Sequence, residues 1–264
     1  MAKILIFGDV FGKLGRGALA KVMPGLIREY SPDLVTANVE NLAHGKGVTE
    51  GTLKELKDAG VDVFTSGNHV FDKLPDAVKC FEVYPELIRP ENYGSGVPGR
   101  GWTRFQKNGQ WYLVVNLGGK VFFENQYKGE IKNPFFEIDR VLAEQAGSDD
   151  IIVVDLHAEA TSEKNAMGWY LDGRVSVFFG THTHIPTADQ RVLPKGTAYV
   201  TDAGMTGPLN SVIGVKTENA LHVFLEKGKF QMEPESEGEC VVNALLVETS
   251  GKRAIQIQRI QKII

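Results

Sequence analysis

The sequence IIVVDLHAEATSEKNAMGWYLDGRVSVFFGTHTHIPT, residues 151–187, decides the fold of this chain. It contains two short apolar runs, residues 151–154 and 175–179, that are rich in β-branched or aromatic residues and bounded by turn formers. Each run predicts a buried strand. The first run ends in Asp-Leu-His, residues 155–157, and the second in Gly-Thr-His-Thr-His, residues 180–184. Histidine is therefore concentrated where two strands stop.

Three of the six histidines of the chain, His157, His182 and His184, lie in this stretch. Ligands of open α/β sheets bind at the carboxyl ends of the strands, which is where these side chains are expected. On an extended segment, His182 and His184 would point to the same side, because side chains alternate with a period of two. We therefore expect imidazoles to converge on a metal ion or a metal pair. The alternative is a surface histidine whose hydrogen bonds are satisfied by the protein or by water, which is the commoner role of a lone histidine.

Length and composition predict a single cytoplasmic domain over residues 1–264. A chain of this length can bury a full core. Its 29 basic and 33 acidic residues argue against a nucleic-acid binder, although a metal could supply local positive charge for a phosphate. No run of about 18 apolar residues and no signal-peptide profile is present, so we expect no membrane association. Cys80 and Cys240 form no metal motif and are interpreted as buried thiols.

The N-terminus begins with a predicted strand over residues 3–7, a glycine-rich turn and a helix. The turn does not fit a phosphate loop, because three residues instead of four separate Gly8 from Gly12, and Leu14 stands where a Mg²⁺-binding Ser or Thr is needed. The glycine spacing also fails the dinucleotide-binding fingerprint. What remains is Asp9, a carboxylate at the end of the strand, which could be a ligand or a helix N-cap.

Two further strand-and-helix units follow in the sequence. Residues 34–39 and 61–65 predict strands, and a helix that begins at Thr49 or Glu50 and runs to about residue 59 connects them. Right-handed crossovers would bring the carboxyl ends of these strands to one side of a parallel sheet. The polar residues that follow the two strands are Glu40, Asn41, Asn68 and His69.

The rest of the chain predicts less regular structure. Residues 74–104 are rich in proline, which predicts a short helix and then a loop, and we interpret them as a small cap or insertion near the mouth of the site. Residues 102–105 and 111–117 predict a hairpin across an Asn-Gly turn at 108–109. Further predicted elements are helices over 18–30 and 134–146, strands over 191–193, 197–201, 241–249 and 254–263, and a turn over 202–208.

Side chains at the strand ends form a candidate metal centre. A mixture of carboxylate, amide and imidazole ligands suits Mn, Fe or Zn better than soft metals. The set is too large for one ion and fits two ions about 3.5–4 Å apart with a bridging carboxylate. Such a pair would bind a phosphoryl group and lower the pKa of a bridging water, while a neighbouring imidazole protonates the leaving alkoxide. The candidates are Asp9, Glu40, Asn41, Asn68, His69, His157, His182 and His184, with His69 as the acid.

Five motifs resemble the YmdB-type branch of the calcineurin-like metallophosphoesterases, and they extend over nearly the whole chain. They are GDVFGKLGR (8–16), NVENLAHGKGVT (38–49), SGNHVFD (66–72), RPENY (89–93) and the long block 155–208. The resemblance implies an α/β fold, a four-layer α/β/β/α sandwich with a small cap. It also implies a dinuclear centre of Fe or Mn, with Zn or Mg as alternatives, and phosphodiesterase activity on 2′,3′- and 3′,5′-cyclic nucleotides.

The resemblance also implies a role for each candidate residue. Asp9 and His184 would bind one ion, with Asn41 nearby or ligating; Asn68, His157 and His182 would bind the second; Glu40 would bridge both; and His69 would be the general acid.

This chain departs from the wider superfamily at two positions of the site. In the wider superfamily a ligand histidine usually follows the sequence Gly-Asp-x, and Phe11 occupies that position here. An aspartate usually bridges the two metal ions, and Glu40 takes its place. Both departures put in doubt any transfer of metal preference or substrate from better known phosphatases. Five further residues would either line the substrate pocket or have structural roles in surface salt bridges and turns; they are Arg16, Glu159, Thr161, Thr206 and Gly207.

The function that this reading predicts is hydrolysis of small phosphodiesters by attack of a metal-bridging hydroxide. A phosphomonoesterase or nuclease on the same site, and a regulatory nucleotide- or partner-binding protein with a structural metal site, stay open as alternatives. An amidohydrolase is disfavoured, because that barrel places its His-x-His pair at the first strand, whereas here the pair comes late. No substrate-binding residue is predicted, and a homo-oligomer is left open.

Overall fold

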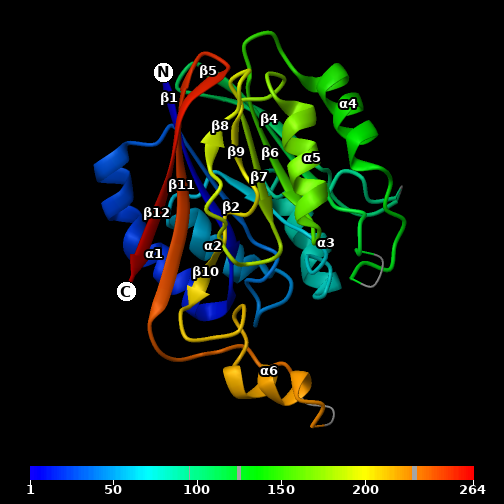
Figure 1. Cartoon of the computed structure of the whole chain (residues 1–264), viewed down its shortest axis with the longest axis vertical. Helices are drawn as coiled ribbons and strands as arrows, with labels where there is room; N and C mark the ends of the chain where they lie inside the picture. The colour runs from blue at the N-terminus through cyan, green and yellow to red at the C-terminus, as the bar shows by residue number, and fades with distance from the viewer. Residues whose placement is uncertain (95, 124–125, 228–230) are drawn as a thin grey trace.

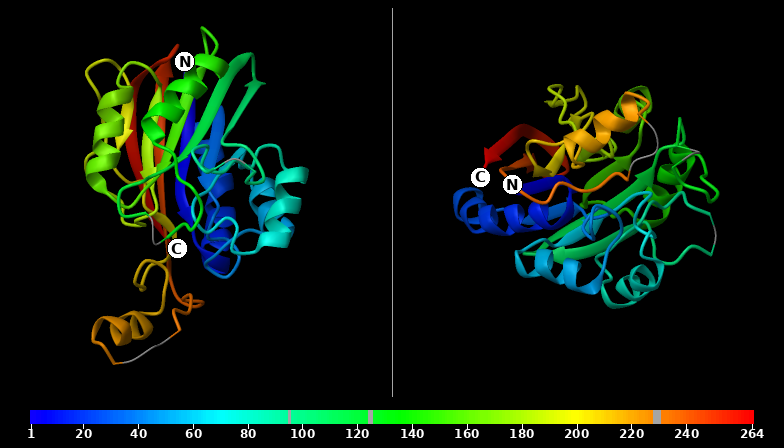
Figure 2. Two further views of the ribbon diagram at one scale, coloured as in Figure 1. Left: turned by 90° about the vertical axis from the view of Figure 1, so that its right-hand side faces the viewer. Right: turned by 90° about the horizontal axis from the view of Figure 1, so that it is seen from below.

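A computed structural model describes residues 1–264 apart from 95, 124–125 and 228–230. Two six-stranded mixed sheets lie face to face, with helices on both outer faces (Figures 1 and 2). This arrangement is the four-layer α/β/β/α sandwich that the sequence motifs implied, so the predicted fold class is confirmed. Within the described residues, no helix combines the length and the apolar character needed to cross a membrane.

The first sheet has the strand order β12-β11-β10-β1-β2-β3. Strands β1, β2 and β3 are parallel, as the successive strand-and-helix units predicted, so their carboxyl ends lie at one end of the sandwich. The strands are β1 (Ala2–Val10), β2 (Leu34–Asn38), β3 (Val63–Thr65), β10 (Met205–Pro208), β11 (Cys240–Ser250) and β12 (Arg253–Ile263).

The second sheet has the order β4-β5-β6-β7-β9-β8, and β5, β6, β7 and β9 are parallel. The predicted hairpin is confirmed, because β4 and β5 pair up to Lys107 and Gln110, and the turn residues Asn108 and Gly109 have φ of 51° and 80°. The strands are β4 (Trp102–Lys107), β5 (Gln110–Gly118), β6 (Ile151–His157), β7 (Val177–Thr181), β8 (Arg191–Val192) and β9 (Ala198–Val200).

Apolar side chains fill the three spaces between the four layers. Along β1, Ile4 and Ile6 belong to the cluster between the sheets, while Leu5 and Phe7 belong to the cluster beneath the helices on the other face. A third cluster separates the second sheet from its helices. Each fully buried side chain of this size contributes about 1.5–3 kcal/mol to stability. The helices are α1 (Gly12–Tyr30), α2 (Glu50–Asp58), α3 (Leu74–Val83), α4 (Pro134–Gln145), α5 (Thr161–Leu171) and α6 (Thr217–Phe224).

The helix after β1 begins at Gly12, six residues earlier than predicted. The first turns of this helix contain several glycines, which have low helix propensity, so the sequence pattern predicts too late a start for the helix. Gly15 is required there, because a Cβ at this position would lie 2.3 Å from the carbonyl oxygen of Thr206 on β10. Asp9 is not a helix N-cap, since Phe11 occupies the N-cap position and makes no side-chain cap.

The structure also differs from the sequence predictions after residue 157, and it shows what residues 74–104 form. Residues 202–208 were predicted to be a turn, but Met205–Pro208 form β10, because pairing with β1 and β11 outweighs the turn preference of Gly and Pro. Neither α5 nor α6 was predicted. Residues 74–104 contain α3 and then mostly irregular chain, and their role as a cap stays a prediction.

A bulge in β1 directs the first candidate ligand. Phe7 pairs with Ala37 and Asp9 pairs with Asn38, so Gly8 is an extra residue on β1. A Cβ on Gly8 would lie 2.0 Å from the carbonyl oxygen of Gly204, so only glycine fits this bulge. Bulges turn the side chain that follows them, and this one directs Asp9 into the space between the sheets.

An arm extends from the end of the sandwich at which β10 ends (Figure 1). We define the arm as residues 209–239, apart from 228–230. A bridge of Val215 to Pro234 joins its two halves near the sandwich, and α6 lies toward its tip. The arm therefore lies at the same end of the molecule as the carboxyl ends of β1, β2 and β3.

Candidate metal centre

The structure brings together all eight candidate residues at the end where the strands of both sheets stop. A pocket of about 790 Å³ lies there, and Glu40, Asn41, His69, His182 and His184 line it. The other three, Asp9, Asn68 and His157, are buried and contact the lining residues directly or through one another. Segments from the first third and the last half of the chain therefore build one site.

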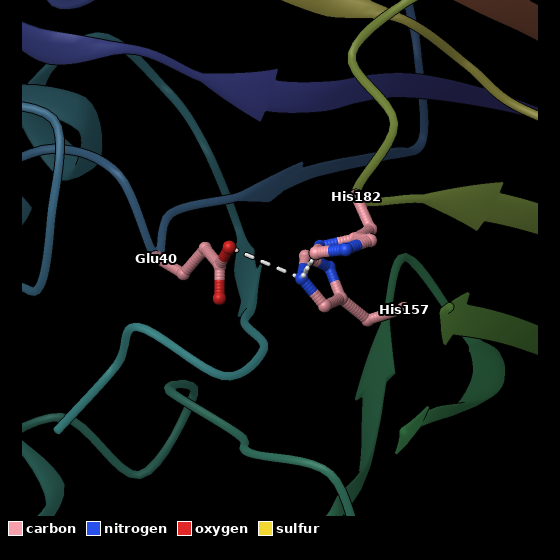
Figure 3. Close-up of side chains that lie close together, drawn as sticks. All are labelled: Glu40, His157 and His182. Carbon is pink, nitrogen blue, oxygen red and sulfur yellow. Dashed lines mark hydrogen bonds and ion pairs between the residues drawn. The ribbon is translucent and has the colours of Figure 1, made fainter. Parts of the chain in front are cut away.

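Four atoms that carry lone pairs meet at Nε2 of His157. Oε1 of Glu40, Oδ1 of Asn68 and Nδ1 of His182 each lie 3.1 Å from this nitrogen. Figure 3 shows Glu40, His157 and His182 pointing toward one another from the ends of β2, β6 and β7. One proton on Nε2 can serve only one of the three acceptors at a time. A cation would satisfy all four atoms together, so this donor set fits a metal ion.

Hydrogen bonds behind the two imidazoles select the tautomers that a metal requires. Thr181 Oγ1 donates to Asp155 Oδ1 (2.7 Å), so it accepts from Nδ1 of His157 (2.9 Å), and Nε2 of His157 keeps its lone pair. Nε2 of His182 lies 3.1 Å from Oε2 of Glu159 and donates to it, which leaves Nδ1 free. Such outer partners commonly orient metal-binding histidines.

A second group of donors lies beside the first. Oδ1 of Asp9 is buried and has no hydrogen-bond partner among the described residues. Nε2 of His184 lies 3.8 Å away from it. Because Nδ1 of His184 donates to the carbonyl oxygen of Ile213 (2.8 Å), Nε2 carries the lone pair. Nδ2 of Asn41 donates to Oε1 of Glu40 (3.4 Å) and lies 3.3 Å from Nε2 of His184. Glu40 thus stands between the two groups.

Burial and charge shift the pKa values of the cluster strongly. Burial acts against the charged form of Glu40, but the attraction of His157 prevails and lowers the pKa of Glu40 well below its usual range. Burial also acts against charge on His157, yet Glu40 raises the pKa of His157 to about 9. Burial raises the pKa of Asp9, although His184 opposes the shift. Burial and the neighbouring His157 lower the pKa of His182 to about 2. The pKa shifts of these four side chains therefore arise from their burial and from one another.

The backbone around the centre is unusual at three positions. A Cβ on Gly67 would lie 2.2 Å from Nε2 of His157 and 2.5 Å from Oε2 of Glu40, so the centre exists only because residue 67 lacks a side chain. His182 and His184 have φ of 92° and 64°, so the expectation of an extended segment is wrong. Both imidazoles nevertheless line the pocket, because the left-handed residues turn the chain back toward it.

His69 differs from the other candidates in its surroundings. Its backbone N–H donates to Oε2 of Glu40 (2.8 Å), and its ring nitrogen Nδ1 lies 2.9 Å from Oδ2 of Asp72. The side chain is 29% exposed and lines the pocket. An imidazole held in this way presents Nε2 to a molecule in the pocket without belonging to the group of ligand atoms.

Of the five residues that could have either a pocket role or a structural role, the structure places only one at the pocket. Arg16 pairs with Glu55 and does not line the pocket, which agrees with the structural reading of its motif. Thr206 and Gly207 are buried in β10, and Thr161 begins α5. Glu159 lines the pocket and contacts His182. Four further residues that support the centre were not predicted from the sequence; they are Asp155, Thr181, Gly67 and Ile213. Only two of them could have been found there: Asp155 is an acid two residues before His157, and Gly67 is a glycine beside Asn68.

The sandwich and the oxygen- and nitrogen-bearing side chains at its strand ends define the metallophosphoesterase class of fold. A 5′-nucleotidase precursor from Thermus thermophilus shares this fold, with a TM-score of 0.57 at 13% identity, over 100% of this chain and 54% of that chain. The sequence profile of the YmdB-like protein family matches residues 5–260, and the chain belongs to this family.

Two relatives are similar over nearly their whole length. The 2′,3′-cyclic-nucleotide 2′-phosphodiesterase of Bacillus subtilis (strain 168) is 40% identical over 260 residues, which cover 98% of this chain and 96% of the relative. The crystal structure of a novel phosphatase from Mycoplasma pneumoniae has a TM-score of 0.92 at 34% identity and covers 99% of this chain and 93% of that one. The predicted family is therefore confirmed.

Proposed function

We propose that this protein is a dinuclear metal-dependent phosphodiesterase that hydrolyses 2′,3′-cyclic nucleotides and, as a second class, 3′,5′-cyclic nucleotides. The observation that carries the proposal is the convergence of Glu40, Asn68 and His182 on Nε2 of His157, beside the oxygen of Asp9 that has no hydrogen-bond partner within the described part of the chain. At a coarser level, the family match and the names of the relatives confirm the prediction of a phosphoric ester hydrolase. A cytoplasmic location and a homo-oligomer stay predictions.

The donor set favours Fe or Mn, with Zn or Mg as alternatives, because it combines imidazoles with carboxylate and amide oxygens and contains no thiolate. Bound ions would neutralise charge on the phosphorus oxygens and supply an activated water as the nucleophile. In our assignment Asn68, His157 and His182 would hold one ion, Asp9 and His184 would hold the other with Asn41 nearby or ligating, and Glu40 would be shared by both.

Two residues of the chain act on the leaving group in this proposal. His69 donates a proton from Nε2 to the alkoxide that leaves phosphorus, since its ring lines the pocket and its Nδ1 is engaged by Asp72. Asp72 positions the ring by accepting the Nδ1 proton, so the proton that Nε2 donates is the second one, which His69 carries as the imidazolium. The exposure of His69 to the pocket also allows it to regain a proton from water after each turnover.

The test combines elemental analysis of protein purified without added metal with a panel of cyclic nucleotides. We expect bound transition metal, turnover of 2′,3′-cyclic AMP, and loss of both metal and turnover in His157→Asn. The matched control is His222→Asn in α6, which changes the same residue type outside the pocket lining. Full metal-dependent activity in His157→Asn would refute the proposal.

The same panel separates the alternatives. A phosphomonoesterase would turn over p-nitrophenyl phosphate faster than bis(p-nitrophenyl) phosphate. A regulatory binding protein would bind the nucleotide without turnover, and His69→Ala would leave its regulatory output unchanged. We expect the diester to be the better substrate.

A further inference from the structure

The pocket at the metal centre has two walls of different chemistry. The ends of the strands and the segments after them carry the ligand atoms and His69, whereas the arm supplies the opposite wall. The apolar residues that this second wall brings to the pocket come from two stretches of the arm and from the start of α1; they are Phe11, Ile213, Val215, Met232 and Pro234.

The arm is held firmly against the pocket. A Cβ on Gly214 would lie 2.6 Å from the ring of Phe11, and a Cβ on Gly45 would lie 2.9 Å from the same ring and 3.1 Å from Pro234. The buried ring of Phe11 is thus enclosed by the loop after β2 on one side and by the arm on the other. The hydrogen bond from His184 to the carbonyl oxygen of Ile213 ties the arm to the metal centre itself.

Apolar side chains of this wall stay exposed although the arm is seated. Ile213 is 42% exposed and Met232 is 45% exposed, and both line the pocket. Exposed apolar surface within a pocket that also holds convergent polar groups marks a ligand site. Gln231, next to Met232, brings an amide to the same wall. A ligand that fits both walls has an anionic end and an apolar body with a polar group for the amide of Gln231.

We propose that the arm wall is a nucleobase subsite, in which the base of the substrate lies against Ile213 and Met232 while the cyclic phosphate lies at the strand ends. The inference rests on the proposed function and adds to it the surface that contacts the base of the nucleotide. A pocket of about 790 Å³ lies within the range of about 300–1,000 Å³ typical of small-molecule sites. Phosphodiesters without a base would use only the first wall.

The test compares 2′,3′-cyclic AMP with the 2′,3′-cyclic phosphate of 1-O-methylribose, which lacks the base. We expect Met232→Ala to raise the KM for the nucleotide about tenfold, as the loss of an apolar contact in a pocket does, and to leave kcat and the base-free substrate unchanged. The control is Phe224→Ala, which removes an apolar side chain that is 75% exposed at the end of α6 and does not line the pocket.

Two outcomes would overturn the subsite. An unchanged KM for the nucleotide in Met232→Ala would show that the base does not touch the wall, and an equal loss with both substrates would show that the change only disturbs the centre. If the wild-type protein turned over neither substrate, the proposed function would fail separately. Calorimetry would then compare the affinities for adenosine 3′-monophosphate and for ribose 3-phosphate. The subsite stands if Met232→Ala weakens the binding of the nucleotide only, and it fails if both affinities change equally or neither changes.

Discussion

At the scale of single residues, the metal centre depends on a position that carries no side chain at all. Gly67 lies beside the proposed ligand Asn68, and its missing Cβ leaves the space in which His157 and Glu40 approach each other. A methyl group there would occupy the place where the ligand atoms meet. The residue that most constrains the centre is therefore one with no functional group.

Gly67→Ala is expected to fold and to lose most of its bound metal, because the added carbon would lie 2.2 Å from Nε2 of His157. Elemental analysis of the purified variant measures the loss, and circular dichroism checks the fold. Gly51→Ala in α2 is the matched control, since nothing lies within 4 Å of its Cβ. A metal content like that of the wild type in Gly67→Ala would contradict our description of the centre.

His69→Ala is expected to lower kcat by about 10²- to 10⁴-fold, which is the usual contribution of a general acid. Metal content should not change, because the contact of residue 69 with Glu40 is made by the backbone N–H and survives the substitution. Steady-state kinetics on 2′,3′-cyclic AMP together with metal analysis test this. A loss of metal in parallel with kcat would show that His69 is a ligand and not the acid.

At the scale of elements, the sequence predicts the strands well and the segments around the pocket poorly. Apolar runs followed by Asp9, Glu40 or His157 place the candidate ligands at strand ends without knowledge of the sheet order. The two helices α5 and α6 were missed: α5 mixes polar and apolar residues without a clear apolar face, and α6 belongs to an arm that packs little of its surface.

The turns at His182 and His184 escaped the sequence reading for a different reason. Their left-handed backbone is imposed by contacts from distant segments, such as the hydrogen bond from the backbone N–H of His182 to Asp9 (3.0 Å) and that from His184 to Ile213. Such long-range constraints leave no local pattern. The candidate ligands could thus be named from the sequence, and the structure brings them together, whereas their geometry and the arm wall could not be predicted.

Helix α1 offers a matched pair of glycine substitutions. Gly17→Ala should raise the free energy of unfolding by about 1 kcal/mol, because Gly17 is exposed, nothing lies within 4 Å of its Cβ, and alanine is the better helix former. Gly15→Ala should lower it, because the Cβ would lie 2.3 Å from the carbonyl oxygen of Thr206. Urea denaturation of both variants measures the two changes. The packing of α1 on β10 would be wrong if the two shifts had the same sign.

At the scale of the whole molecule, the two sheets and the arm converge on one end, where the proposed metal ligands lie together. Removal of metal by a chelator is therefore expected to lower Tm, and addition of Mn²⁺ to raise it again, because a ligand that binds only the folded state stabilises it by RT ln(1 + [L]/Kd). Differential scanning calorimetry measures both shifts. Gly67→Ala serves as the control and should respond to neither treatment.

The central claim is that two ions lie side by side between the strand ends. Anomalous scattering from crystals of the metal-loaded protein locates such ions directly. We predict two peaks about 3.5–4 Å apart, one within about 2.0–2.2 Å of Nε2 of His157 and Nδ1 of His182, and the other beside Asp9 and His184. A single peak, or two peaks away from these side chains, would contradict the account.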